Sequence, residues 1–155
     1  MISFKITSLT IPDGLLTEFR QYASIPDSDT RTDNLETFLR SAILRVQAYA
    51  DKAFAPCTCT LERTVPDGGR IRLYLGGGTV TGVSDSDGAA VGYARMASDV
   101  IKVQATPGLV VTVAYEVTPA DGTAAQLKAT VLRYATALYD GAPQEELGAI
   151  LNEVL

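Results

Sequence analysis

The sequence contains no histidine, and only two of its 155 residues are cysteines. Without histidine, neither a Ser-His nor a Cys-His catalytic pair can form. The two cysteines, Cys57 and Cys59, are one residue apart, a spacing at which a disulfide rarely closes without strain. Metal binding would need further ligands. We therefore expect two small buried or half-buried thiols in a reducing compartment, and the sequence supports neither an enzymatic activity nor a cofactor.

Long apolar runs and basic residues are also scarce. No run approaches the roughly 20 residues that a membrane-spanning helix needs. The N-terminal stretch MISFKITSLTIPDG alternates polar with apolar residues, so we expect no signal peptide, no membrane association, and a protein that is cytosolic or assembled in a cytosol. With 13 Lys and Arg against 18 Asp and Glu, the net charge is −5. This balance argues against a surface that binds nucleic acid through its phosphates.

The most strongly periodic stretch lies between Thr30 and Pro56. Its apolar residues recur at spacings of three and four, which predicts an amphipathic helix over about 34–54, with Asp33 or Asn34 as N-cap and Pro56 as its stop. At about 1.5 Å per residue this helix would span roughly 30 Å. Because no other segment is so long and periodic, we expect the rest of a single domain, 1–155, to pack on it.

After this helix the apolar period changes to two, which is typical of strands. Turn signals, mostly glycine-containing, separate the runs and favour an antiparallel meander over 57–117. The last run is the most apolar, so we expect it to be central. The predicted strands are 2–7 near the N-terminus, then 57–65, 70–75, 79–83, 90–96, 99–105 and 109–117.

Helical periodicity before and after the strands completes the outline. A short helix is predicted over 15–23, and a longer one over 124–138, with Thr118 or Asp121 as N-cap. Gly141 should end the longer helix. The fold class is therefore α+β: a small helical bundle around a long central helix, with an inserted antiparallel β-meander that forms a β-rich insert over 57–117.

A C-terminal amphipathic arm is expected over 143–155. Anchors at helical spacing can dock in a partner's groove, or the same face can fold back on the chain's own helices. The break at Gly141-Ala142-Pro143 and the acidic opposite face favour an exposed arm. The candidate anchors are Leu147, Ile150, Leu151 and Val154.

Two glycine-rich or acidic turns are candidate loop contacts. Neither fits a phosphate-binding loop or a complete calcium loop, because a lysine at a helix start is missing from the first and a third acidic ligand from the second. A flexible hairpin tip and a polar turn are preferred, and a ligand- or metal-binding domain using the 76–92 loops stays an alternative. The residues are Gly76, Gly77, Gly78, Asp85 and Asp87.

Five stretches together form a familiar arrangement: the short helix LLTEFRQYASIP, the acidic loop DSDTRTDN, the helix end AYADKAF, the strand VAYEVTP and the helix DGTAAQLKATVLRYATALYDG. This arrangement resembles the head–tail connector, or head-completion adaptor, proteins of tailed bacteriophages and prophages. Tyr115 to Pro119 is similar to the family's Y-x-x-x-x-P element with one residue fewer. The resemblance covers about 13–56 and 109–141, and the strand-rich middle is longer than in compact helical members.

The resemblance implies a non-enzymatic structural protein in the neck of a virion. Neighbouring copies would form a homo-oligomeric ring beneath the portal protein, bind a tail or stopper protein, and let DNA pass through the channel without specific binding. An acidic surface is compatible with DNA passage, because it repels phosphate. The C-terminal anchors would dock on the portal. Another virion part, such as a tail-completion protein, remains an alternative.

Overall fold

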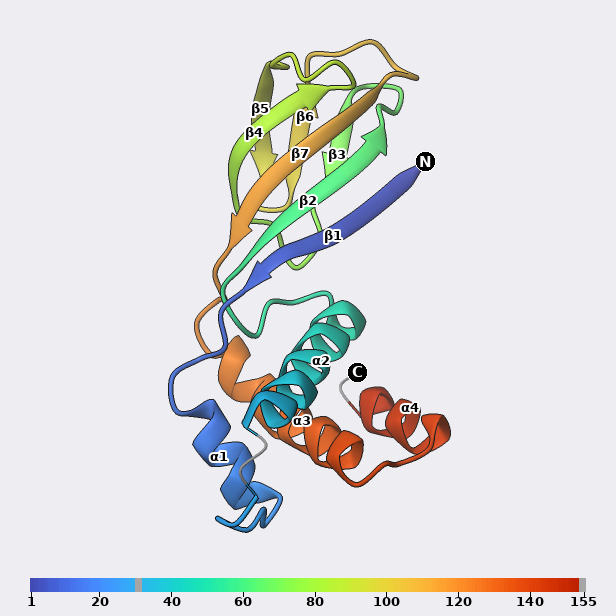
Figure 1. Ribbon diagram of the computed structural model, residues 1–155. Helices are drawn as coiled ribbons and strands as arrows, with labels where there is room; N and C mark the ends of the chain where they lie inside the picture. Colours follow the sequence, from blue (N-terminus) through green and yellow to red (C-terminus); the bar gives the residue numbers. More distant parts are fainter. Residues whose placement is uncertain (30–31, 154–155) are drawn as a thin grey trace. The chain divides into compact units, whose positions relative to one another are not determined.

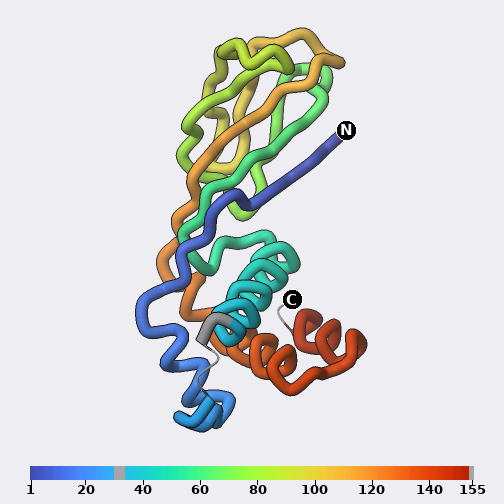
Figure 2. Tube along the Cα trace, in the orientation of Figure 1, coloured from blue at the N-terminus to red at the C-terminus, as the bar shows by residue number. Residues whose placement is uncertain are grey.

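The chain is organised in two compact units, each built from two stretches of sequence. The computed structural model describes residues 1–29 and 32–153 (Figures 1 and 2). Met1–Leu9 and Pro56–Thr118 form the β unit, and Thr10–Ala55 and Pro119–Leu155 form the helical unit. The β-rich part therefore includes the N-terminal strand as well as the central segment. That both units fold as one domain stays a prediction.

The β unit consists of two antiparallel sheets. The first has four strands in the order β1-β2-β7-β4, and the second has three in the order β3-β6-β5. The strands are β1 (Ile2–Leu9), β2 (Cys57–Thr64), β3 (Arg70–Arg72), β4 (Thr79–Asp85), β5 (Tyr93–Ala97), β6 (Val100–Val103) and β7 (Val110–Val117). The α+β class is confirmed, but the strand order is not that of a meander, because β7 lies between β2 and β4.

The interior position of β7 follows from its sequence and confirms that the last strand is central. Every second side chain along the strand is buried, as expected where one face covers a core. The register pairs Val113 with Leu61 of β2 and Val83 of β4, so buried side chains of three strands meet in one row. An edge position would have left part of this apolar face exposed to water.

The helical unit is built around two long helices that pack side by side (Figure 1). Leu35, Leu39 and Val46 on one and Val131 and Ala135 on the other are buried, which gives the amphipathic stripes that the periodicity predicts. Tyr49 continues the helical spacing of the apolar stripe, but its side chain is 38% exposed. The helices are α1 (Leu15–Tyr22), α2 (Thr32–Ala50), α3 (Thr123–Tyr139) and α4 (Gln144–Asn152).

The boundaries of α2 differ from the expected ones. The helix begins at Thr32, so Asp33 and Asn34 lie inside it, and it ends at Ala50, well before Pro56. Asp51 takes a left-handed conformation with φ of 50°. Because the helix ends there, the backbone nitrogens of Phe54 and Ala55 have no helical carbonyl to bond. The Oε1 atom of the buried Gln47 side chain accepts their hydrogen bonds instead, at 2.8 Å and 3.0 Å.

The start of α3 also differs from the expected one. The N-cap is Gly122, with φ of 80° and no side-chain capping bond, instead of Thr118 or Asp121. The left-handed turn at this glycine replaces a capping side chain as the means of starting the helix. No helix in the described part of the chain is both long and apolar enough to span a membrane.

Candidate partner-binding surfaces

Helix α4, the expected docking arm, folds back on its own unit. It packs against α3, and Leu147 and Ile150 are buried, with 3% and 7% exposure. The expectation of an exposed arm is therefore wrong for these two anchors. Leu151 is half-buried, and Val154 lies outside the described residues.

A tight turn explains why α4 reverses onto α3. Gly141 takes a φ of 72°, and its backbone nitrogen donates to the Leu138 carbonyl at 3.2 Å. The next backbone nitrogen, of Ala142, donates to the Ala137 carbonyl at 2.9 Å. This is the glycine-terminated helix end in which the last free carbonyls find donors. The glycine therefore turns the chain back instead of releasing a free arm.

Two polar contacts hold the far end of α4. The Arg133 guanidinium of α3 donates to both carboxylate oxygens of Glu153, and the Tyr49 hydroxyl of α2 donates to Asn152 Oδ1 at 2.5 Å. The hydrogen bonds from Arg133 hold the pKa of Glu153 below its ordinary value, and those to Glu153 raise the pKa of Arg133. Both side chains are exposed, so the ion pair positions the helix end more than it stabilises the fold.

A hollow of about 310 Å³ opens beside this contact in the helical unit. Tyr22 of α1, Asp140 after α3 and Glu146 of α4 line it together with the Arg133–Glu153 pair. Tyr22 exposes 48% of its surface. No local pattern in the sequence predicts this hollow, because Tyr22 of α1 lies more than 100 residues before the lining residues of α3 and α4.

The glycine-rich turn at 76–78 is packed, which corrects the expectation of a flexible hairpin tip. Gly77 lies so close to the backbone of Ser98 that a Cβ would collide with its carbonyl oxygen, and a Cβ on Gly78 would collide with the Glu116 carbonyl oxygen. Arg95 of β5 donates to the carbonyl oxygens of Gly78 and Ser98. The glycines therefore allow close backbone packing.

The acidic turn at 85–88 uses one of its carboxylates internally. Asp85 Oδ1 accepts hydrogen bonds from the backbone nitrogens of Asp87 and Ala89, both at 2.9 Å. This is the side chain-to-backbone bonding that stabilises polar turns. Among the residues that the structure describes, no three His, Cys, Asp or Glu side chains gather as metal ligands would.

The two cysteines lie on β2, facing the same side, and are both free and buried. Their sulfur atoms are 3.8 Å apart, at hydrogen-bonding distance for thiols. The hydrogen bond with Cys57 and burial raise the pKa of the Cys59 thiol. A protonated, buried thiol is a poor nucleophile.

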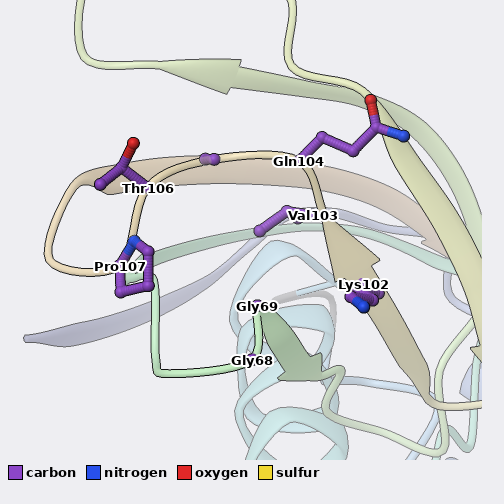
Figure 3. A pocket seen from close by; sticks show the side chains of 8 residues that line it. Gly68, Gly69, Lys102, Val103, Gln104, Thr106 and Pro107 are labelled. Atoms are coloured by element: carbon purple, nitrogen blue, oxygen red, sulfur yellow. The ribbon is translucent and has the colours of Figure 1, made fainter.

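A wide hollow of about 560 Å³ lies at one end of the three-stranded sheet (Figure 3). Its lining includes Lys102 on β6 and Gln104 directly after β6. Thr106 and Pro107 line it from the loop before β7. Gly69 also lines the hollow, and its carbonyl oxygen accepts a hydrogen bond from the Val103 nitrogen at 2.9 Å. With Lys102 as its one charged lining residue, this hollow has no acid–base pair for catalysis.

Charge is divided unevenly between the two units. The β unit contains six acidic and six basic residues, and the helical unit contains twelve acidic and seven basic ones. The helical unit therefore carries the whole net charge of −5, and the β unit is formally neutral. The acidity of the sequence thus belongs to the helical unit as a whole.

Comparison with solved structures identifies proteins with this fold. No protein-family model matches the chain, and no curated protein matches it. A chain from the neck of an empty gene transfer agent particle, computed with C6 symmetry, aligns over 98% of this chain and 94% of its own length, with a TM-score of 0.65 and 20% identity. A chain from the virion of the native gene transfer agent particle aligns over 97% and 93%, with a TM-score of 0.65 and 19% identity. The chain is thus similar in fold, across both units, to proteins of these particles.

Proposed function

We propose that this protein is a structural component of the neck of a phage-like particle: a non-enzymatic head–tail connector subunit that forms a ring beneath the portal. The observation that supports it best is the likeness in fold to a neck protein over nearly the full length of both chains. Fold alone does not define function, so the proposal also rests on the connector-like motifs, four of which lie in the helical unit and one on β7.

The charge distribution supports the same role. A ring that extends a DNA channel must let the duplex pass without holding it, and excess acidic residues repel phosphate. The helical unit, with its net charge of −5, would face the channel or the portal. The ring's other partners would be a tail or stopper protein, and its contacts with neighbouring copies would be heterologous, with one face meeting a different face of the next copy.

The experiment is to mix the purified chain with portal-containing heads that lack a neck and to image the particles by electron microscopy. We expect a ring of added density directly below the portal. Density on isolated tails instead would favour a tail-completion protein. Heads that gain no density at any protein concentration would refute the connector role.

A further inference from the structure

The β unit exposes four sheet edges, and they are not equally protected. An exposed edge strand presents unpaired backbone groups that can pair with another chain, and proteins usually shorten, bulge or cover such edges. β3 has only three residues. The outer edge of β4 is covered by 89–91, since Asp85 N donates to the Ala89 carbonyl at 2.9 Å and Val91 N donates to the Val83 carbonyl at 2.8 Å.

β1 differs because it is eight residues long and has a strand on one side only. The Thr64 nitrogen donates to the Met1 carbonyl at 3.1 Å, so this pair is a hydrogen-bonded one. Hydrogen-bonded and non-hydrogen-bonded pairs alternate along an antiparallel ladder. The backbone N–H and C=O groups of every second β1 residue therefore point away from β2. By the observed register, the residues with outward N–H and C=O groups are Ile2, Phe4 and Ile6.

β5 is the edge of the other sheet, and Figures 1 and 2 show it on the opposite side of the β unit from β1. All five of its residues are exposed. The Gln104 nitrogen donates to the Gly92 carbonyl at 2.7 Å, so alternation directs the backbone groups of Tyr93 and Arg95 outward. A bulge follows Arg95, which leaves a short open edge.

Both strands also carry exposed large apolar side chains. Ile2 on β1 is 55% exposed, and Tyr93 and Met96 on β5 are 41% and 49% exposed. The two edges therefore combine backbone hydrogen-bonding groups with apolar area, which is what strand addition uses.

We propose that the β1 edge of one copy pairs with the β5 edge of the next, so that the β units form the contacts between copies. This proposal rests on the ring of the proposed function, because a ring needs two different surfaces on each copy. The division of charge indicates which parts of two copies meet. Formally neutral β units can approach one another, whereas helical units of net charge −5 repel. The pairing of two short edges is small, so the free chain associates weakly.

The test is cross-linking of the full chain at millimolar concentration with a flexible bismaleimide. The double variant Ile2→Cys/Met96→Cys should give a ladder of dimers, trimers and higher species, because each copy contributes both edges. The matched double variant Ile2→Cys/Tyr22→Cys, with the second cysteine at a 48% exposed position of the helical unit, should stay at the background of the single variants. Dimers from Ile2→Cys alone would show β1–β1 pairing and overturn the proposal, as would the absence of a ladder from the first variant.

A second pair of variants tests the backbone. Ile2→Pro removes one outward N–H without breaking the β1–β2 ladder, and Ile2→Val keeps it. We expect Ile2→Pro to weaken self-association about tenfold relative to Ile2→Val in sedimentation equilibrium, the effect of roughly one hydrogen bond. Equal association of the two would contradict strand pairing. Added density below the portal without these cross-links would refute this contact alone, whereas cross-links without density would refute the connector role.

Discussion

The hydroxyl of Tyr115 on β7 accepts a hydrogen bond from the backbone nitrogen of Tyr74 at 3.0 Å. Tyr115 is only 1% exposed, and it thereby joins the interior of the four-stranded sheet to the segment that follows β3. The Tyr74 ring in turn meets Phe4 of β1 edge to face, with centroids 5.1 Å apart. One buried hydroxyl thus fixes the segment on which a β1 side chain packs.

Replacing this hydroxyl should destabilise the β unit. We expect Tyr115→Phe to lower the free energy of unfolding by about 1 kcal/mol, because the Tyr74 N–H loses its partner. Urea denaturation followed by circular dichroism measures the change. Tyr74→Phe is the matched control, since it removes a tyrosine hydroxyl but keeps the backbone donor. An equal loss in both variants would contradict the importance of the Tyr115–Tyr74 bond.

Alanine substitutions at Gly76 and Gly77 can separate the cost of a left-handed backbone from the cost of a steric collision. Both have positive φ, 81° and 83°, but a Cβ on Gly76 would meet nothing within 4 Å, and one on Gly77 would collide with Ser98. Gly76→Ala should cost about 1–2 kcal/mol for the left-handed conformation alone. Gly77→Ala should cost about 1–3 kcal/mol more, because the backbone must move apart.

Urea denaturation of the two glycine variants side by side measures this difference. Equal costs would mean that the turn tolerates a side chain at both positions, as a flexible hairpin tip would. A larger cost for Gly77→Ala than for Gly76→Ala therefore indicates a packed turn, and equal costs indicate the flexible tip that the sequence suggests.

The end of α4 should respond to acid through Glu153. Its pKa in the folded protein is lowered by the hydrogen bonds from Arg133, relative to an ordinary value of 4.5. A lowered carboxyl pKa contributes stability that is present above the ordinary value and is lost as the pH falls through the lowered one. We expect amide exchange in the last turn of α4 to speed up over that acidic range.

The variant Glu153→Gln should remove this acid response, and Glu145→Gln, at an exposed position in the first turn of the same helix, should keep it. High salt should weaken the response of the unmodified chain, because both partners are exposed. An unchanged exchange profile in Glu153→Gln would show that the ion pair does not hold the helix end.

If α4 docks on the portal, its half-buried Leu151 is the described anchor still within reach of a partner. We expect Leu151→Asp to abolish the added density on portal-containing heads and to keep the far-ultraviolet circular dichroism of the unmodified chain. Leu147→Asp is the contrasting variant: it places a charge at a 3% exposed site and should cost about 3–5 kcal/mol of stability. Loss of helical signal in Leu151→Asp would instead make Leu151 part of the core.

Local patterns predicted most of the elements. The 3.6-residue period identified α2 and α3, and the change to a two-residue period after Pro56 identified the strands, because burial along one face leaves a repeat that can be read in a single segment. The apolar character of 109–117 also predicted that the last strand is central, and β7 lies between β2 and β4. The α+β class, the long amphipathic helices and the absence of histidine chemistry thus depended on the sequence alone.

Contacts between distant segments were decided only in three dimensions. The Gln47 side chain accepts a hydrogen bond from the backbone just after α2. The backbones of Ser98 and Glu116 pack against the glycine-rich turn that the sequence presents as flexible. The turn at Gly141 reverses the chain so that α4 packs on α3. The split into a neutral β unit and an acidic helical unit likewise requires knowing that β1 joins the central strands. Each depends on which residues, far apart in the chain, become neighbours, and no local period records that.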